Sequence, residues 1–279
     1  IPNWVPFSSK LTALILLQVV LLFVVMLCGL IIQAFMGYYN FEISLYFKSL
    51  FGLQFIDYAL FCVLAMLVQV IVNHKYLGHF IMVVYFLVSI FMAQFGWEHK
   101  LYDYADDPGY TYSDMNGFGH FILPVGWFKV YWTAFAVLLA ILSNLFWVRG
   151  LETSLKWRAI IAGRHFNKPA KIAVIIALLV FFVSGGFIFY NTNILNEYMT
   201  GNEREELSLE YEKRYKKFEN SPQPRITGVN VNVDIYPLRR DFTFKGYYIL
   251  KNKTKEAIDS IHIDINRNIT INNMSFDRD

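Results

Sequence analysis

Long runs of apolar residues fill the first 196 positions of the chain and are rarely interrupted by charge. A helix that crosses a bilayer core of about 30 Å needs about 20 mostly apolar residues. Five stretches meet this requirement and lack the polar face of a soluble helix. They run from about Leu11 to Phe35, Leu53 to Val72, His79 to Trp97, Val130 to Val148 and Ile172 to Tyr190. The pattern predicts an α-helical transmembrane bundle of about five spans.

A polar segment with helical spacing follows the last apolar stretch. Its recurring apolar residues are Leu207, Tyr211, Tyr215 and Phe218, and its i,i+4 charge pairs are Glu210–Arg214 and Glu212–Lys216. Asn202-Glu-Arg-Glu205 resembles a capping box with Asn in place of Ser or Thr, and Ser221-Pro-Gln-Pro224 ends the helix. Two roles stay open for it: a spacer that holds a domain off the membrane, or a charged helix packed on that domain.

From Ile226 onward the apolar period changes to two. The candidate strands cover 229–235, 242–249, 258–265 and 269–276. A turn at Pro237–Asp241 separates the first two, and Gly246 marks the site of a bulge in the second. Alternation of this kind predicts antiparallel strands with a single buried face. The fold class is therefore a transmembrane helical bundle followed by the start of an antiparallel β domain.

Composition divides the chain into regions that face different solvents. Of its 279 residues, 56% are hydrophobic and 17% charged, whereas soluble domains average about 25% charged residues. We expect a transmembrane region over 1–195, an amphipathic helix and Pro linker over 196–224, and the start of a β domain over 225–279. Cys28 and Cys62 lie in apolar runs, where packing is expected rather than a disulfide. Because the chain begins at Ile and ends in a strand-like stretch, we interpret it as a piece of a longer protein.

Lysine and arginine in short loops set the orientation of a membrane protein. The segment 149–171 carries six basic residues against the single acid Glu152, so it is predicted to be cytoplasmic. The segment 97–126 carries five acids against Lys100, so it is predicted to lie outside. Lys10 and the turn at His74-Lys75 fall inside on the same scheme. The tail after the fifth span is then extracytoplasmic, and the protein is expected in an inner (cytoplasmic) membrane.

Motifs for catalysis are absent from the sequence. It contains neither the phosphate-binding loop G-x-x-x-x-G-K-[ST] nor the zinc motif H-E-x-x-H. His74 and His79 are five residues apart, which is poor spacing for two ligands on one helical face. We assign no catalytic, cofactor-binding or metal-binding residue, and we expect neither ATP hydrolysis nor peptidase activity from this chain alone.

Polar groups in the membrane region leave alternatives open. The amide residues inside the spans are Gln18, Gln33, Gln69, Gln94 and Asn144. Either these amides and Asp57 line a pathway, or the amides hold helices together and Asp57 lies at the membrane interface. The acidic outside loop with His99 and His120 is either a weak cation site or a solvated loop. The apolar stretch Phe41–Phe51 either lies in the headgroup plane or packs on the bundle.

Two parts of the sequence resemble known families. The stretch Val231–Thr254, with a strand, a short turn, a Phe-x-Gly element and an Asn/Thr turn, resembles the opening strands of the N-terminal β domain of aminopeptidase N-like (gluzincin) zinc peptidases. The stretches Tyr38–Phe51 and Val72–Phe80 look like the permease half of Bacteroidetes fusion proteins that join a type-2 ABC transporter permease to such a domain. The zinc and substrate motifs of the family would lie beyond Asp279, so no site residue is carried over.

The resemblance implies a permease subunit of an ABC-type transport system that carries an extracytoplasmic peptidase-like domain. Its expected partners are the lipid bilayer, a separate ATP-binding subunit, and a second permease half or a second copy; no nucleic acid is implied. The alternative is a membrane anchor for a zinc aminopeptidase, in which zinc would belong to the missing downstream domain. The transported substrate is not indicated.

The segment 149–171 is the sizeable cytoplasmic surface on which an ATP-binding subunit would dock. Its apolar edge is predicted from Leu151, Leu155, Ile160 and Ile161. Its basic residues Lys156, Arg158 and Arg164 are expected to stay solvated or to meet acidic groups. The competing interpretation is that these charges only fix the orientation of the chain.

Overall fold

The computed structural model describes residues 3–147, 155–239, 241–266 and 269–277. The chain forms two compact units, residues 1–204 and residues 205–279. The first is mostly helical, and the second ends in a two-stranded antiparallel sheet. The predicted fold class is confirmed at this level.

Five helical segments of the first unit are long and apolar enough to cross a membrane. The first segment is α1 (Trp4–Phe35). The second joins α2 (Ile43–Tyr46), the π-helix η1 (Phe47–Gln54) and α3 (Phe55–Val72), and the third joins α4 (Lys75–Met92) and the 3-10 turn η2 (Ala93–Phe95). The fourth joins the 3-10 turn η3 (Gly119–Phe121) and α5 (Ile122–Leu145), and the fifth joins α7 (Lys168–Phe189) and the π-helix η4 (Tyr190–Ile194). A shorter helix, α6 (Leu155–His165), precedes α7. The fourth span was expected from about Val130 but begins at Ile122, because Lys129 lies inside the helix instead of bounding it.

Local capping explains where two of these helices begin. Asn73 adopts a left-handed conformation with φ of 51° and ends α3, as Asn often does at helix ends. The next residue, His74, accepts the backbone N–H of Leu77 through Nδ1 and caps α4. Asn167 caps α7 by accepting the N–H of Ala170, with proline in the first turn.

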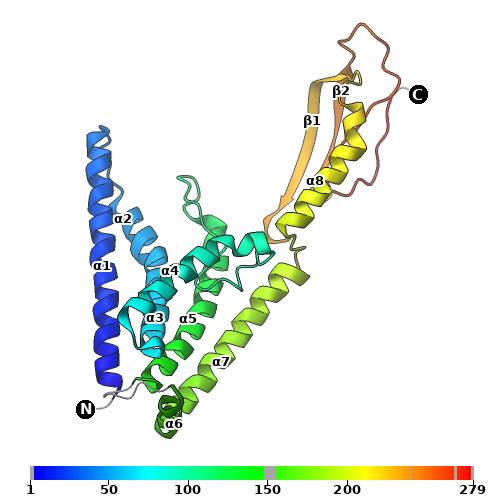
Figure 1. The fold of residues 1–279 in the computed structure, drawn as a ribbon. Coiled ribbons are helices and arrows are strands. Elements are labelled where there is room, and N and C mark those ends of the chain that lie inside the picture. The colour runs from blue at the N-terminus through cyan, green and yellow to red at the C-terminus, as the bar shows by residue number, and fades with distance from the viewer. Residues whose placement is uncertain (1–2, 148–154, 240, 267–268, 278–279) are drawn as a thin grey trace. The chain divides into compact units, whose positions relative to one another are not determined.

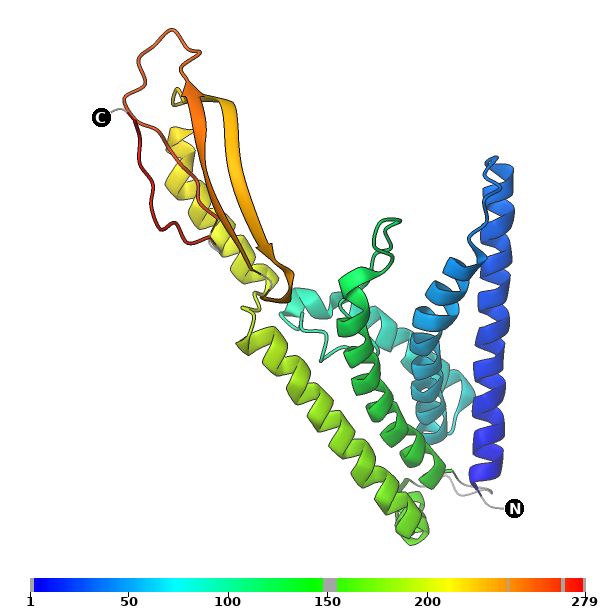
Figure 2. The same ribbon diagram turned by 180° about the vertical axis from the view of Figure 1, so that it is seen from behind.

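Helix α5 is the centre of the bundle. It packs against α3 on one side and α7 on the other, and α3 in turn contacts α1 and α4; Figures 1 and 2 show α5 between α3 and α7. The share of buried residues is 39% in the α5 span but 11% in the α1 and α4 spans. The core comprises Leu60, Tyr104, Phe128, Tyr131, Trp132 and Ile188 with their neighbours. The wide exposed apolar faces of α1 and α4 suit contact with lipid.

The apolar segment that was expected either in the headgroup plane or on the bundle packs on the bundle. It forms α2 and η1 and runs directly into α3. The ring of Tyr46 lies against Gly29 of α1, where an added Cβ would come within 2.7 Å of the tyrosine hydroxyl. Glycine at this position therefore lets the two segments approach closely.

Helix α8 (Gly201–Tyr215) continues into a short 3-10 turn (Lys216–Phe218), as the sequence pattern predicts. Its capping box, however, is not Asn202–Glu205. The backbone N–H of Glu203 donates to the Thr200 hydroxyl at 3.3 Å, and the backbone N–H of Thr200 donates to the Glu203 carboxylate at 2.8 Å. The box is thus Thr200-x-x-Glu203, so the prediction at Asn202 is wrong. The two expected i,i+4 ion pairs are present at 3.3 and 3.0 Å.

Strands β1 (Arg225–Tyr236) and β2 (Asp241–Lys251) pair antiparallel. The prediction of a single buried face is wrong: β2 is exposed along its whole length, and β1 is partly covered only at Gly228 and Val231. Two strands alone supply no second layer to cover a face. The irregularity in register falls between Ile226 and Gly228 and not at Gly246. Glycine is needed at 246 because a Cβ there would lie 2.1 Å from the Asn230 carbonyl oxygen.

The third and fourth candidate strands are also wrong, since the described residues of 258–265 and 269–276 contain no strand. Instead, the Gln223 side chain accepts the N–H of His262 at 2.9 Å and donates to Ser260, as a neighbouring strand would. The Phe218 ring stacks on His262 at 3.9 Å, and Tyr211 of α8 donates to Asp264. Only the Tyr211 contact comes from α8 itself, and no residue of α8 is buried, so both roles for the helix stay predictions.

Candidate functional site

The candidate site is built around the α3–α5 helix pair, which carries buried charge at both ends. At one end, Lys129 of α5 is 6% exposed. Its ammonium contacts Asp57 of α3 and, at 2.7 Å, Asp107 of the loop before α5. A buried charge is costly unless it is paired and hydrogen-bonded. The two carboxylates therefore explain how a lysine is tolerated inside an apolar span.

This cluster was not predicted as a unit. Asp57 was expected either to line a pathway or to lie at the membrane interface, and Lys129 was expected to bound the fourth span. The structure places them in direct contact, so Asp57 joins helices. The available signal was the presence of opposite charges at the same predicted end of two apolar stretches, the start of the second and the start of the fourth.

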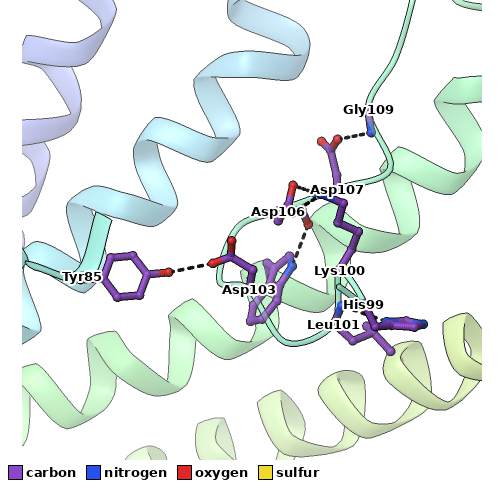
Figure 3. Close-up of polar contacts among 9 residues, drawn as sticks. Tyr85, His99, Lys100, Leu101, Asp103, Asp106, Asp107 and Gly109 are labelled. Atoms are coloured by element: carbon purple, nitrogen blue, oxygen red, sulfur yellow. Dashed lines mark hydrogen bonds and ion pairs between the residues drawn. The ribbon is translucent and has the colours of Figure 1, made fainter. Parts of the chain in front are cut away.

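The acidic loop 97–118 folds onto the bundle instead of extending into solvent. Asp103 accepts the Tyr85 hydroxyl of α4 at 3.2 Å, and Lys100 pairs with Asp106 at 2.5 Å, as Figure 3 shows. The acidic loop is therefore solvated only in part: Asp103 and Asp106 are half-buried, whereas Lys100 and Asp114 are exposed. Burial, reinforced by the neighbouring Asp106, raises the pKa of Asp103.

Two further contacts fix the loop to the α3–α5 pair. The indole N–H of Trp132 in α5 donates to the Asp106 carbonyl at 2.9 Å. The Tyr104 hydroxyl donates to the Leu60 carbonyl of α3, also at 2.9 Å. Together with the Lys129–Asp107 ion pair, these bonds make the loop a cover over one end of both helices.

His99 serves this cover as a structural residue. Its Nδ1 accepts the N–H of Leu101 at 3.2 Å, so Nε2 carries the proton and donates to Asn193 and Thr192 near the end of the α7 span. Burial lowers the pKa of the imidazole, which favours this neutral form. His120 instead stacks on Phe121, so the two histidines are not brought together.

A polar cavity of about 250 Å³ opens beside the loop, lined by Glu98, Lys100, Asp103, Asp106 and the end of α4. Within the described ranges, no group of three or more His, Cys, Asp or Glu side chains is placed to hold a metal ion. The salt bridges and hydrogen bonds above already engage Lys100, Asp103 and Asp106. These loop residues therefore bind one another and the helix bundle.

One of the amide residues inside the spans also lies in a contact between helices. Gln69 of α3 lies directly against Gly78 of α4, where an added Cβ would come within 2.5 Å of the amide oxygen. This contact favours the structural interpretation of Gln69 over a pathway.

At the other end of the pair, the sequence interpretation of Arg158 is wrong. This α6 residue was expected to stay solvated or to meet acidic groups, but it is 3% exposed and binds backbone carbonyls. Its guanidinium donates to the carbonyls of Val70 and Ile71 in the last turn of α3 and to Phe146 at the end of α5. Helix ends leave carbonyls without partners, and these attract the arginine. Burial lowers its pKa, yet an arginine keeps its charge.

The remaining residues of the predicted docking segment differ in exposure. Lys156, Ile160 and Arg164 are exposed on α6, while Ile161 is half-buried. Leu151 and the side chain of Leu155 lie outside the described residues. The predicted apolar and basic surface is thus retained in part, with Arg158 removed from it.

The fold and these charged ends define the class as an integral membrane protein with five candidate spans and a smaller unit bearing a β-hairpin. Comparisons with protein-family models, curated proteins and solved structures find no match to this chain.

Proposed function

We propose that the chain is the membrane (permease) subunit of an ABC-type transport system, driven by a separate ATP-hydrolysing protein. The observation that carries the proposal is the attachment of α6 to the ends of α3 and α5. One side of this helix is anchored to two spans through Arg158, and Trp157 and Ile160 are exposed within the described part of the chain. A force applied to α6 by a partner would therefore act directly on α3 and α5.

The exposed side of α6 has the character of a docking surface. Trp157 and Ile160 are 59% and 49% exposed, and their spacing places them on one helical face. Lys156 and Arg164 flank them and are exposed as well. An apolar patch with basic neighbours fits a partner groove that has an apolar floor and an acidic rim.

The position of α6 also supports the proposed orientation. Arg158 contacts the end of α3, which is followed at once by the His74-Lys75 turn that was predicted to be cytoplasmic. The basic segment and this turn thus share one end of the bundle. A cytoplasmic α6, an extracytoplasmic tail and an inner-membrane location are all parts of the proposal.

Photo-crosslinking in the native host tests it. A benzophenone amino acid at Ile160 should yield an adduct whose peptides include a G-x-x-x-x-G-K-[ST] sequence. The same label at Leu179, an exposed residue of the α7 span, is the control and should not yield it. Lys156→Glu with Arg164→Glu should reduce the adduct. No adduct, or one formed only with lipid, contradicts the docking of an ATPase.

A second function is favoured by the separate compactness of residues 205–279. In this proposal the helices anchor an extracytoplasmic zinc aminopeptidase, and the hairpin is the first part of its N-terminal β domain. Codons after Asp279 that encode H-E-x-x-H and a further Glu, together with zinc-dependent release of amino acids by the longer protein, would support it. Absence of the motif would leave transport alone. Both functions can be held by one protein.

A further inference from the structure

Arg158 is a junction between three helices. Its Nη1 donates to Ile71 at 3.1 Å, while its Nη2 donates to Phe146 at 2.7 Å and also to Val70. One side chain of α6 therefore binds the carboxyl ends of α3 and α5 at the same time. Any separation of these three helices would break hydrogen bonds to a buried charge.

The electrostatics of this junction are favourable because two helix ends converge on one cation. Each helix carries about half a negative charge at its carboxyl terminus. Together, the ends of α3 and α5 offset about one positive charge. The planar guanidinium can donate in several directions at once, whereas a lysine ammonium on a flexible stem cannot fix two helix ends in the same way.

The opposite end of the same helix pair is fastened by the other buried cation. Lys129 of α5 contacts Asp57 of α3, and between the two cations Leu60, Trp132 and Ala136 pack in the shared core. Helices α3 and α5 are thus joined at both ends and along their length. Such a pair has few ways to deform internally and moves most readily as one body.

We propose that Arg158 and Lys129 make α3 and α5 a rigid lever, which carries a displacement of α6 to the loop 97–118 at the far end. The loop receives it through Lys129–Asp107, Trp132 to the Asp106 carbonyl, and Tyr104 to the Leu60 carbonyl. Arg158 is a positioning residue for this motion. The inference rests on the proposed function at one point: the partner ATPase is what displaces α6.

Hydrogen–deuterium exchange of the 279-residue chain in lipid nanodiscs tests the lever without any partner. Arg158→Met keeps most of the side-chain volume and removes the donors. It should speed exchange in α6 and also, at least about 5-fold, in residues 97–107, because coupling between sites commonly spans about 5- to 150-fold. Arg164→Met, on the exposed side of the same helix, is the matched control and should change neither region.

The reverse experiment uses the reciprocity of coupling. Asp57→Asn weakens the far fastening and should speed exchange in α6. Arg158→Lys keeps the charge but cannot bridge both helix ends, so it should loosen the loop as Arg158→Met does. If Arg158→Met does not fold, the lysine and Asp57 variants make the same comparison.

Three results overturn the lever: faster exchange confined to α6 in the Arg158 variants, full rescue of the loop by lysine, or no effect of Asp57→Asn on α6. Failure of the lever is separable from failure of the proposed function. Crosslinking at Ile160 reports only on the partner, and exchange in the isolated chain reports only on the coupling.

Discussion

Replacing Lys129 by methionine tests the ion cluster with the least exposed side chains among the salt bridges of the described residues. The change keeps an unbranched side chain of similar length but leaves Asp57 and Asp107 facing each other without a cation. Removing one partner of a buried pair costs about 3–5 kcal/mol. The Asp57 and Asp107 side chains are 23% and 12% exposed, so water recovers part of this cost, and we expect about 3 kcal/mol.

The assay is thermal unfolding in detergent, followed by tryptophan fluorescence, since Trp132 lies in the core beside the cluster. For a unit of this size, 1 kcal/mol corresponds to about 2–4 °C, so Lys129→Met should lower Tm by about 6–12 °C. Lys100→Met is the matched control: its pair with Asp106 is 47% and 32% exposed, and such pairs are worth about 0–1 kcal/mol.

A double-mutant cycle separates the ion pair from loss of packing. Asp57→Asn in the Lys129→Met background removes one unpaired carboxylate. The double variant should therefore be more stable than the sum of the two single losses implies. A Tm for Lys129→Met within about 2 °C of the parent, or losses that add fully in the cycle, would refute the reasoning.

Three other predictions concern the loop, α8 and the orientation. Burial lowers the pKa of His99 from 6.5, so the folded chain holds fewer protons on this residue than the unfolded chain does. The stability that this neutral histidine contributes is therefore retained above pH 6.5 and lost as the pH falls below it. The Tm of His99→Gln should accordingly fall less steeply between pH 7.5 and 5.5 than the Tm of the parent. Thr200→Ala should destabilise α8 by about 1 kcal/mol, as measured by amide exchange. Asn202→Ala should change the stability of α8 by no more than about 0.5 kcal/mol. Equal losses from the two substitutions would contradict Thr200 as the capping residue. Alkaline phosphatase fused after Asn202 should be active in cells and fused at Gly163 silent, and the reverse pattern would invert the proposed topology.

The helices of the bundle could be predicted from the sequence because their signal is local. An uncharged run long enough to cross a bilayer has few alternatives, since backbone groups in lipid must be satisfied internally. The stretch around α1, without a charge from Leu11 to Phe41, needs no tertiary information. The same holds for the i,i+4 pairs of α8, which depend only on spacing along one helix.

Strand number and burial could not be predicted in the same way. The alternation at Ile261, Ile263 and Ile265 is that of a strand, but a strand also needs a partner with free backbone groups and a layer to cover it. In the second unit that segment is held instead by the Gln223 side chain, the Phe218 ring and the Tyr211 hydroxyl. Period-two alternation specifies a face, and only the fold decides whether anything covers it.

The sequence by itself determined the membrane spans, their approximate limits and the change of pattern after residue 196. Only the tertiary structure decided the fate of individual charges. Lys129 and Arg158 look in sequence like boundary and loop residues, yet both are buried, one by carboxylates from α3 and the loop and the other by carbonyls at two helix ends. A buried charge is tolerated only where partners converge on it. That convergence depends on residues far apart in the chain, which no local pattern records.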